Sequence, residues 1–422
     1  MFNIELLRTD KESVTKLLKS RNVDISSLNS ILELDIERRK LIERTDNFRS
    51  ERNKTSKELS SMKEKPESII VEMRKLGDKI KEYEKKLDTS NSDLQNLLQS
   101  IPNLPSKDIP VGPDEDSNKI IFTQEIPVEK NNFKSLPHWD IGSKFNLIDF
   151  QRGVKLSGSR FYILKNKGAQ LQRALSNWML DTHIKNGYNE YYVPHIVKES
   201  VQFGAGQLPK FKDTMFKDNE SKLWLIPTAE VPVTNIYSNE ILDVEKLPIK
   251  IVAQTPCYRN EKAAAGKDTR GIKRVHQFEK VELYQFVKPE KSTKTLESML
   301  ETCTKLCKDL GLTYRIKLLC TGDLGFCSNK TYDIEVWSPG SKEWLEVSSI
   351  SNCIDFQSRR ANIKYKRTSK SKTEYVHTLN GSGLALPRII IAILESFQNE
   401  DGSIDIPEIL WPYTGFKKIT NT

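Results

Sequence analysis

Long apolar runs are missing from this 422-residue chain. No run approaches the ~20 consecutive apolar residues that a membrane-spanning helix needs. The first residues, Met-Phe-Asn-Ile-Glu-Leu-Leu-Arg-Thr-Asp-Lys-Glu, contain acids and no extended apolar core, which is unlike a secretory signal or a transit peptide. We therefore expect a cytoplasmic protein with no membrane partner.

Cysteine and histidine are scarce and widely spread. The six cysteines form no Cys-x-x-Cys pair and the five histidines are scattered, so the usual zinc-site spacings are missing. Cys303 and Cys307 stand four residues apart in a helix predicted over 295–310, which places them on one face. We interpret them as small, reduced core residues rather than as zinc ligands.

The composition describes a globular protein with one highly charged part. Hydrophobic residues make up 37% of the chain and charged residues 29%, and the length allows two or three domains. The net charge of +9 favours polyanionic partners. Charge of this kind informs on association rather than on fold.

Residues 1–105 carry a helical pattern unlike the rest of the chain. The pattern runs from Leu28 to about Ser61, breaks near Pro66 and resumes to about Leu98. Apolar residues in its second half recur at spacings of three and four, as in a coiled-coil seam: Ile69, Met73, Leu76, Ile80, Tyr83, Leu87 and Leu94. The first half offers Leu28, Ile31, Leu32, Leu41, Ile42 and Phe48. The pattern predicts an antiparallel coiled-coil hairpin, with helices about 45 Å long at ~1.5 Å per residue.

The charges of this hairpin admit two interpretations. Between Arg38 and Ser90, sixteen Lys and Arg stand against eleven Asp and Glu. A mild excess can simply keep a helix surface solvated, and for any single lysine we favour that interpretation. Taken together, the charges also fit a long arm that follows a nucleic-acid backbone through salt-sensitive phosphate contacts.

A proline-rich segment ends this region, and the pattern changes beyond it. Residues 101–113 hold four prolines and a glycine, which is typical of a semi-rigid linker. We assign 106–132 to the linker and lead-in, and 133–422 to one further domain. That domain is expected to be α+β, with an antiparallel sheet flanked by helices rather than a doubly wound parallel sheet. Strand candidates lie at 223–227, 249–258, 274–286, 313–320, 331–337 and 343–350, and helix candidates at 170–185 and 383–398.

The stretch 258–282 is the most informative part of the sequence. It begins apolar and ends in an alternating pattern, which predicts two strands joined by a long, basic tip that contains glycine. Arg259 and Arg274 stand at the two ends of the tip, where they can hold phosphates by forked hydrogen bonds. Glu261 and Glu282 can accept hydrogen bonds from amino or hydroxyl groups. The alternative is an ordinary surface hairpin with scattered charges.

Three shorter runs also carry candidate chemistry. In residues 379–388, Leu-Asn-Gly-Ser-Gly-Leu-Ala-Leu-Pro-Arg, a turn of small residues is expected to lead into an apolar helix whose single arginine needs an anion or a salt bridge. The Glu-Val-Ser-Ser run at 346–349 is expected on a strand, where Glu and Ser oxygens suit Mg²⁺ shared with phosphates. In the Thr-Ala-Glu run at 228–230, the carboxylate can bind an ammonium group by charge-assisted hydrogen bonds.

In this order, these elements resemble the seryl-tRNA synthetases, a family of class II aminoacyl-tRNA synthetases. The stretch 258–282 resembles motif 2, residues 379–388 resemble motif 3, and residues 168–194 resemble motif 1, the dimer element. The Thr-Ala-Glu and Glu-Val-Ser-Ser runs and the N-terminal hairpin extend the resemblance over essentially the whole chain.

Departures from the family pattern are small. Lys262 and Ala263 stand where the family usually has Ala-Gly after the motif 2 glutamate. Pro387 stands where a glycine usually precedes the motif 3 arginine. The first departure bears on the RNA contacts of the loop, and the second on the start of the following helix.

The resemblance implies a serine–tRNA ligase. Such an enzyme activates L-serine with ATP and Mg²⁺, then transfers serine to the 3′ end of tRNA(Ser), with tRNA(Sec) left open as a second substrate. The resemblance implies catalytic roles for Arg259 and Arg388 and metal ligation by Glu346 and Ser349. Serine would be bound by Thr228, Ala229, Glu230, Glu282, Asn380 and Ser382. ATP would be bound by Arg259, Asn260, Glu261, Arg274, Val275, Phe278, Glu346, Val347, Ser348, Ser349 and Arg388. For Phe278, stacking on the base competes with a plain core role.

The resemblance further implies a homodimer formed through motif 1, and no DNA partner. Two rival interpretations stay open. A synthetase paralogue that charges a carrier protein would not need the basic arm. A non-catalytic RNA-binding or coiled-coil adaptor would not need the three arginines and the Glu-Val-Ser-Ser run.

Overall fold

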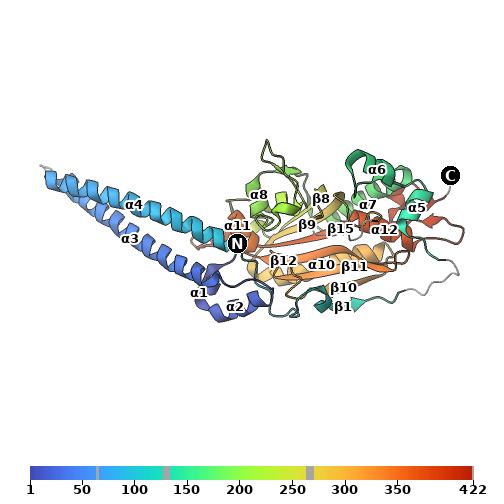
Figure 1. Ribbon diagram of the computed structural model, residues 1–422, viewed down its shortest axis with the longest axis horizontal. Coiled ribbons are helices and arrows are strands. Elements are labelled where there is room, and N and C mark those ends of the chain that lie inside the picture. Colours follow the sequence, from blue (N-terminus) through green and yellow to red (C-terminus); the bar gives the residue numbers. More distant parts are fainter. Residues whose placement is uncertain (63–65, 127–133, 263–269, 421–422) are drawn as a thin grey trace. The chain divides into compact units, whose positions relative to one another are not determined.

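The computed structural model describes residues 1–62, 66–126, 134–262 and 270–420. The chain divides into two compact units (Figure 1). We call Phe2–Pro102 the N-terminal unit, and Met1 with Asn103–Thr422 the main unit. Among the described residues, none of the helices combines the length and the apolar character that crossing a membrane requires.

The N-terminal unit is helical, and its long helices have the bounds that the sequence predicts. Its helices are α1 (Ile4–Thr9), α2 (Lys11–Lys19), α3 (Leu28–Ser61) and α4 (Glu67–Leu98). The side chains of Asn3 and Asp10 accept hydrogen bonds from the first turns of α1 and α2, which stabilises the two short helices. Helices α3 and α4 run side by side (Figure 1), so the predicted helical hairpin is confirmed.

The buried positions of α3 and α4 are mostly apolar. Among the described residues, the apolar ones are Leu28, Ile31, Leu41, Leu76, Ile80, Leu94 and Leu98. The rings of Phe48 and Tyr83 meet edge to face at 5.3 Å, which joins the two helices. The apolar spacing does not predict the burial of three polar residues, Asp35, Thr45 and Ser90.

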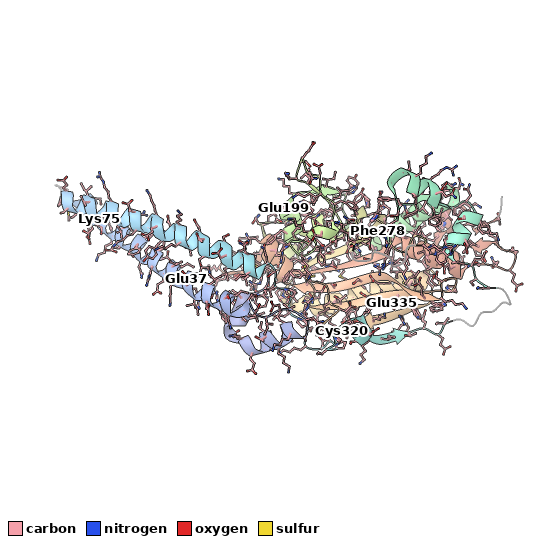
Figure 2. All side chains as sticks on the ribbon, viewed as in Figure 1. Glu37, Lys75, Glu199, Phe278, Cys320 and Glu335 are labelled. Atoms are coloured by element: carbon pink, nitrogen blue, oxygen red, sulfur yellow. The ribbon has the colours of Figure 1, made fainter. Side chains whose placement is uncertain are left out.

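One of these polar residues, Asp35, is held by three arginines. Asp35 accepts two hydrogen bonds of 2.7 Å from Arg8, and it lies 3.4 Å from Arg38 and 3.1 Å from Arg39. A buried carboxylate is tolerated when it is paired in this way. Glu37 and Lys75, labelled in Figure 2, instead belong to the exposed, charged outer faces of the two helices.

The main unit is built on one large sheet. Within the described residues its eight strands have the order β1 (Lys119–Thr123), β10 (Tyr314–Leu318), β11 (Lys330–Ser338), β12 (Glu343–Ile354), β15 (His377–Ala385), β9 (Gln277–Val287), β8 (Ile249–Tyr258) and β4 (Asn189–Glu190). All neighbouring pairs are antiparallel except β4 and β8, which are parallel. The predicted α+β fold with an antiparallel sheet is confirmed.

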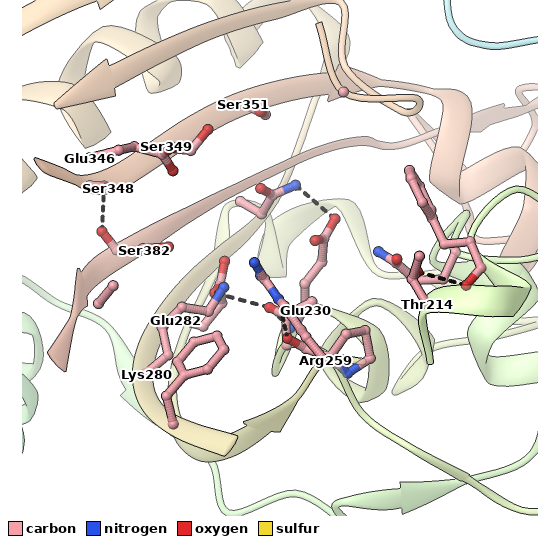
Figure 3. Close-up of a pocket in the computed structure, with 18 of the residues that line it drawn as sticks. Thr214, Glu230, Arg259, Lys280, Glu282, Glu346, Ser348, Ser349, Ser351 and Ser382 are labelled. Carbon is pink, nitrogen blue, oxygen red and sulfur yellow. Dashed lines mark hydrogen bonds and ion pairs between the residues drawn. The ribbon is translucent and has the colours of Figure 1, made fainter. Parts of the chain in front are cut away.

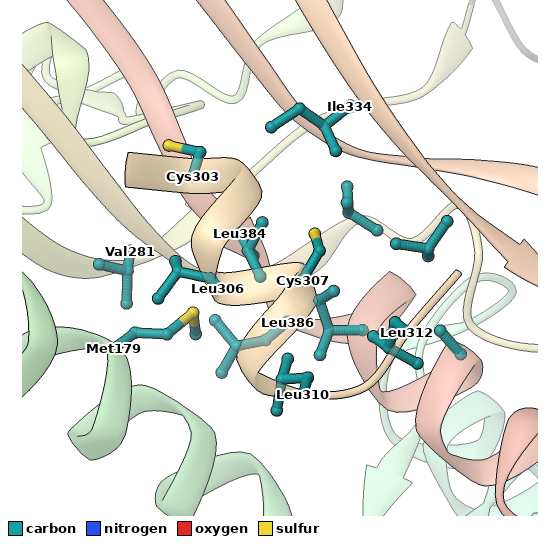
Figure 4. Packing of buried hydrophobic residues seen from close by; sticks show 14 of the residues in the cluster. Met179, Val281, Cys303, Leu306, Cys307, Leu310, Leu312, Ile334, Leu384 and Leu386 are labelled. Carbon is teal, nitrogen blue, oxygen red and sulfur yellow. The ribbon is translucent and has the colours of Figure 1, made fainter. Parts of the chain in front are cut away.

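Helices cover one face of this sheet and share a continuous apolar core with it. They are α7 (Asn166–Lys185), α10 (Ser292–Asp309) and α12 (Leu386–Ser396). Figure 4 shows Met179 of α7, Leu306 of α10 and Val281 of β9 in this core. Cys303 and Cys307 are fully buried in it as free thiols, as the sequence predicts.

Shorter elements complete the main unit. Its remaining helices are α5 (His138–Lys144), α6 (Phe150–Ser157), α8 (Glu199–Gly204), α9 (Glu230–Asn235), α11 (Phe356–Ala361) and α13 (Trp411–Thr414). Its small sheets pair β14 (Thr373–Tyr375), β13 (Lys364–Lys366) and β7 (Ile241–Leu242); β16 (Ile404–Asp405) and β17 (Lys418–Ile419); β2 (Ile148–Asp149) and β3 (Ile163–Leu164); and β5 (Ile196–Val197) and β6 (Trp224–Leu225). Its 3-10 helices include η1 (Glu115–Ser117), η2 (Lys212–Thr214), η3 (Val244–Lys246), η5 (Pro289–Lys291) and η6 (Glu408–Leu410).

One local prediction is wrong. The sequence predicts that residues 379–388 begin with a small-residue turn and lead into a helix over 383–398, but residues 379–385 belong to the strand β15, and α12 begins at Leu386. The strand pairs on both sides, with β12 and β9, and this long-range pairing outweighs the local preference of small residues for turns. A Cβ on Gly381 would meet the Ile350 side chain at 3.1 Å, so the glycine allows close packing within the strand.

The end of β15 also explains how Pro387 is accommodated. The register with β9 shifts between Ser382 and Ala385, where Leu384 has a φ of 105°. This irregularity ends the strand, and α12 begins immediately afterwards. Pro387 lies in the first turn of α12, where its missing N–H costs no helical hydrogen bond.

Candidate active site

A cavity of about 540 Å³ lies over the sheet face opposite the helical core. Successive side chains of a strand point to opposite faces, so Val281 and Leu283 enter the core, whereas Lys280 and Glu282 line the cavity. Most of the candidate residues from the sequence line this cavity: Thr228, Glu230, Arg259, Glu261, Arg274, Val275, Phe278, Glu282, Glu346, Val347, Ser348, Ser349, Asn380, Ser382 and Arg388. Figure 3 labels Glu230, Arg259 and Glu282 among them. Of the described candidates, Ala229 and Asn260 lie outside the lining.

The two exceptions have structural contacts instead. Ala229 is fully buried at the start of α9, between Thr228 and Glu230. The backbone N–H of Asn260 donates to the carbonyl of Thr214 at 2.9 Å. Both residues therefore support the lining rather than form it.

One end of the cavity is organised around Glu282 of β9. Its side chain is only 3% exposed, and its Oε2 accepts from Thr228 Oγ1 at 3.1 Å. Lys280 Nζ lies 2.5 Å from the same oxygen. Ser382 stands directly opposite Glu282 in the pairing of β15 with β9. A small polar group at this end would meet a carboxylate that is already oriented.

A second carboxylate, that of Glu230, lies nearby. Its Oε1 accepts from Gln357 Nε2 at 2.6 Å and from Asn380 Nδ2 at 2.9 Å. Removal of this carboxyl from solvent, with a smaller contribution from Glu282, raises the pKa of Glu230 to about 7. The two carboxylates together create an environment suited to an ammonium group, since a cation relieves their repulsion.

The β8–β9 hairpin places Arg259 beside an aromatic ring. The Arg259 guanidinium lies 5.2 Å from the centroid of the Phe278 ring, and Arg259 Nε donates to Pro227 O at 3.3 Å. Beyond the strands, Arg259 N donates to His276 O at 2.9 Å, which continues the hairpin toward its tip. The predicted hairpin is confirmed, and residues 263–269 of its tip, with Ala263, lie outside the described residues.

Another part of the cavity lining consists of Arg388 and the Glu-Val-Ser-Ser run of β12. Arg388 Nη1 donates to Glu346 O at 2.6 Å and lies 3.6 Å from the Glu346 carboxylate. Ser348 Oγ donates to Ser382 O at 2.6 Å, which joins β12 to β15. Arg388 therefore contacts Glu346 and also lines the cavity.

Glu346 and Ser349 add carboxylate and hydroxyl oxygens to the lining near Arg388. Ser349 pairs in register with Asp333 of β11. Burial, with Glu346 as the next cause, raises the pKa of Asp333 well above its ordinary value. Carboxylate and hydroxyl oxygens are suitable ligands for Mg²⁺, which usually shares its shell with phosphates and water. Within the described ranges, groups of three or more His, Cys, Asp or Glu able to hold a metal are absent.

Known families and relatives match this chain over nearly its whole length. A model of the tRNA synthetase class II core domain (G, H, P, S and T) matches residues 210–397, and one of the seryl-tRNA synthetase N-terminal domain matches residues 1–105. The serine–tRNA ligases of Chloroflexus aurantiacus and Roseiflexus sp. are each 50% identical over 417 residues, which is 98% of this chain and 98% of each relative. The chain belongs to the seryl-tRNA synthetase family.

Solved structures of the seryl-tRNA synthetase family agree with this fold. The seryl-tRNA synthetase of Pyrococcus horikoshii, complexed with ATP, is similar with a TM-score of 0.93 and 36% identity, covering all of both chains. The cytoplasmic serine–tRNA ligase of Naegleria fowleri, complexed with AMP, has a TM-score of 0.88 and 29% identity, covering 100% of this chain and 99% of its own. The resemblance stated from the sequence is confirmed.

Some residues in and around the cavity carry little signal in the sequence of this seryl-tRNA synthetase family member. Lys280 alternates with Phe278 and Glu282 along β9, so the period of a strand is a usable signal for it. Gln357 gives no such signal, because it meets Glu230 across 127 positions of sequence. Thr214 lines the cavity from the short 3-10 helix η2, where local patterns carry little information.

Proposed function

We propose that the chain is a serine–tRNA ligase, which activates L-serine with ATP to seryl-adenylate and then transfers serine to the 3′ end of tRNA(Ser). The observation that carries this proposal is one cavity whose lining combines the carboxylates of Glu230 and Glu282 with arginines from two separate motifs. A small amino acid and a nucleoside triphosphate require these two kinds of partner side by side. Membership of the seryl-tRNA synthetase family supports the same assignment.

The carboxylates of Glu230 and Glu282 would bind the amino acid. Glu230 accepts the serine ammonium group, and Glu282 accepts the serine hydroxyl. Thr228 orients Glu282, since its hydroxyl already donates to that carboxylate. Asn380 orients Glu230 in the same way, and Ser382, opposite Glu282, completes this end of the cavity.

The arginines would hold the reacting groups. Arg259 contacts the serine carboxylate and the α-phosphate, and Arg274 and Arg388 neutralise the outer phosphates. Adenine lies against the Phe278 ring, with Glu261 as a hydrogen-bond acceptor. Phe278 already stacks with the Arg259 guanidinium, which supports an aromatic platform at this position. Further support for the nucleotide would come from Asn260, Val275, Val347 and Ser348.

The first step then needs orientation more than a protein nucleophile. A serine carboxylate oxygen attacks the α-phosphorus, the bond to the bridging oxygen breaks, and pyrophosphate leaves with the electron pair. Positioning and stabilisation of developing charge account for the rate. Glu346 and Ser349 would hold Mg²⁺, which when bound neutralises phosphate charge.

The second step requires the tRNA. A hydroxyl of its terminal ribose attacks the acyl carbon, and AMP leaves. The helical hairpin of α3 and α4 is the proposed arm for the tRNA backbone, and its excess of basic residues supports that use. Since the proposed chemistry involves only serine, ATP and the 3′ end of the RNA, tRNA(Sec) would be charged in the same way if the arm accepts it.

Assembly and location complete the proposal. We infer a homodimer through residues 168–194, where Tyr192 is 89% exposed and Ile184 is 42% exposed. Large apolar side chains exposed in one segment favour a protein interface. The proposed location is the cytoplasm, where tRNA, ATP and serine meet.

Two assays test the function together. Serine-dependent exchange between pyrophosphate and ATP is expected, and so is serine charging of purified tRNA(Ser). Exchange without charging would favour an enzyme that loads another carrier. Loss of both would favour a non-catalytic RNA-binding adaptor.

A further inference from the structure

A buried histidine–glutamate pair lies outside the cavity and connects two of its walls. His138 is the first residue of α5, and Glu395 lies in the last turn of α12. His138 Nδ1 lies 2.9 Å from Glu395 Oε1, and the two side chains are 2% and 0% exposed. The backbone N–H of His138 donates to the same oxygen at 2.8 Å. The pair therefore fixes α5 to α12 by both side chain and backbone.

Glu395 also fixes a third element. Its Oε2 accepts from Ser338 Oγ at 2.6 Å and from Ser341 N at 2.8 Å, and its Oε1 accepts from Ser341 Oγ at 2.9 Å. Ser338 ends β11, and Ser341 lies in the turn before β12. Five hydrogen bonds thus converge on one buried carboxylate, which is satisfied without any contact to the cavity.

The second ring nitrogen of His138 reaches the β8–β9 hairpin. With Nδ1 donating to Glu395, a neutral imidazole has its Nε2 lone pair available. Ile272 N donates to that nitrogen at 3.1 Å, and Ile272 is fully buried. A Cβ on Gly271 would lie only 2.0 Å from His138 Nε2, and Gly271 has a φ of 78°. Glycine at this position permits the close approach.

The contacted segment continues directly into the cavity. Lys273 and Arg274 follow Ile272, and both line the cavity. Lys273 Nζ lies 2.5 Å from Glu343 Oε2, and Arg274 O accepts from Arg160 Nη1 at 3.2 Å. The segment that carries Arg274 is therefore held at several points.

Glu395, the other member of the pair, lies on the same helix as Arg388. Glu395 follows Arg388 by seven residues on α12, which is about two helical turns at ~3.6 residues per turn. Since a short helix moves as a rigid rod, anchoring Glu395 anchors Arg388. One buried pair thus connects the segment that carries Arg274 with the helix that carries Arg388.

We propose that His138 is a positioning residue, which with Glu395 sets the placement of Arg274 relative to Arg388 so that both guanidinium groups meet the outer phosphates of one ATP. This inference rests on the proposed function of the cavity. Two arginines on separate elements hold one triphosphate only if their spacing is kept within about 0.5 Å. The pair is suited to that task, because it joins both elements through buried, satisfied hydrogen bonds.

The test uses two substitutions that divide the roles of the ring. His138→Asn keeps an amide near the Nδ1 position for Glu395 and removes the acceptor for Ile272. His138→Gln reaches the Nε2 position and restores that acceptor. His377→Asn is the matched control, because His377 is half-buried and its Nδ1 lies 3.0 Å from Ser292 Oγ, away from the cavity lining.

Measurements in the full-length protein are KM for ATP and KM for serine in pyrophosphate exchange, with the thermal midpoint. We expect His138→Asn to raise KM for ATP about tenfold with KM for serine changed less than about twofold, since misplacement affects only the phosphate contacts. His138→Gln should recover most of the loss. An unchanged KM for ATP, or a parallel rise of both KM values in His138→Asn and His377→Asn, would overturn the proposal.

Calorimetry with a non-hydrolysable ATP analogue separates this proposal from the assignment of the enzyme. Weaker binding in His138→Asn than in the unmodified protein and in His377→Asn is expected. If the unmodified protein shows no serine-dependent exchange, the proposed function fails, while this binding comparison still decides whether His138 positions a nucleotide site. Equal binding by all three proteins would contradict the role of His138.

Discussion

Lys280 and Glu282 form an ion pair inside the cavity, with Lys280 Nζ 2.5 Å from Glu282 Oε2 and side-chain exposures of 9% and 3%. Both residues lie on the cavity side of β9. The lysine offsets the charge of a carboxylate that would otherwise be costly to bury. It thereby leaves Glu282 as a fixed acceptor at the end of the cavity proposed for serine.

Lys280→Met should therefore destabilise the protein and weaken serine binding. Loss of one partner leaves a buried carboxylate unpaired, for which about 3–5 kcal/mol is typical. Urea unfolding and KM for serine measure the two effects. Lys305→Met is the control, because Lys305 pairs with Asp309 at an exposed position; equal losses in both variants would show that the buried pair has no special role.

Glu282→Ala should reduce the selection of serine over alanine. We expect a loss of about 2–4 kcal/mol in kcat/KM for serine, as for a lost hydrogen bond to a charged acceptor. Kinetics with alanine should change much less, since alanine has no hydroxyl to contact Glu282. The account of Glu282 as the hydroxyl acceptor is wrong if the two amino acids keep their ratio of kcat/KM.

Glu230 should make serine binding depend on pH. Its pKa is raised to about 7, chiefly by burial, so below that pH the carboxyl in the free site is protonated and cannot attract the serine ammonium. Binding then releases a proton, and KM for serine should rise as pH falls through the region of this pKa. Above it, KM should level off. The profile should be lost in Glu230→Gln, and an identical profile in that variant would assign the titration to another group.

Deletion of residues 2–102, the N-terminal unit, should separate activation from transfer. All proposed active-site residues lie at Thr228 or later, so the remaining chain should still form seryl-adenylate. Charging of tRNA should fall by orders of magnitude at subsaturating tRNA, because the arm would supply the backbone contacts. Adenylate formation and charging are measured side by side. Loss of both activities would make the arm part of the catalytic fold, and loss of neither would exclude it as the tRNA arm.

Those parts of the fold whose pattern is local could be predicted from the sequence. The α3–α4 hairpin follows from its apolar spacing, and the β8–β9 hairpin from alternation around a glycine-containing tip. The strand at 379–385 could not be predicted in this way, because its small residues favour turns and only pairing with β12 and β9 makes it a strand. The burial of Asp35 could not be predicted from the sequence either, because its partner Arg8 lies on another helix.

The residues of the candidate site also differ in whether the sequence identifies them. Arg259 and Glu282 can be identified from the sequence because their motif is short and chemically distinctive. Gln357 and His138 act through partners far away in sequence, so only the folded chain brings them to Glu230 and Ile272. Positioning residues of this kind leave no local pattern, whereas residues that meet a ligand often do.

Arg259→Ala removes the side chain on which the proposed activation of serine depends most. Arg259 is proposed to hold the serine carboxylate and the α-phosphate together, while its Nε makes a 3.3 Å hydrogen bond to Pro227 O. The measurement is serine-dependent exchange of pyrophosphate into ATP, made beside circular dichroism of the same preparation. We predict exchange in the unmodified protein and its loss in a folded Arg259→Ala variant. Near-normal exchange in that variant would contradict it.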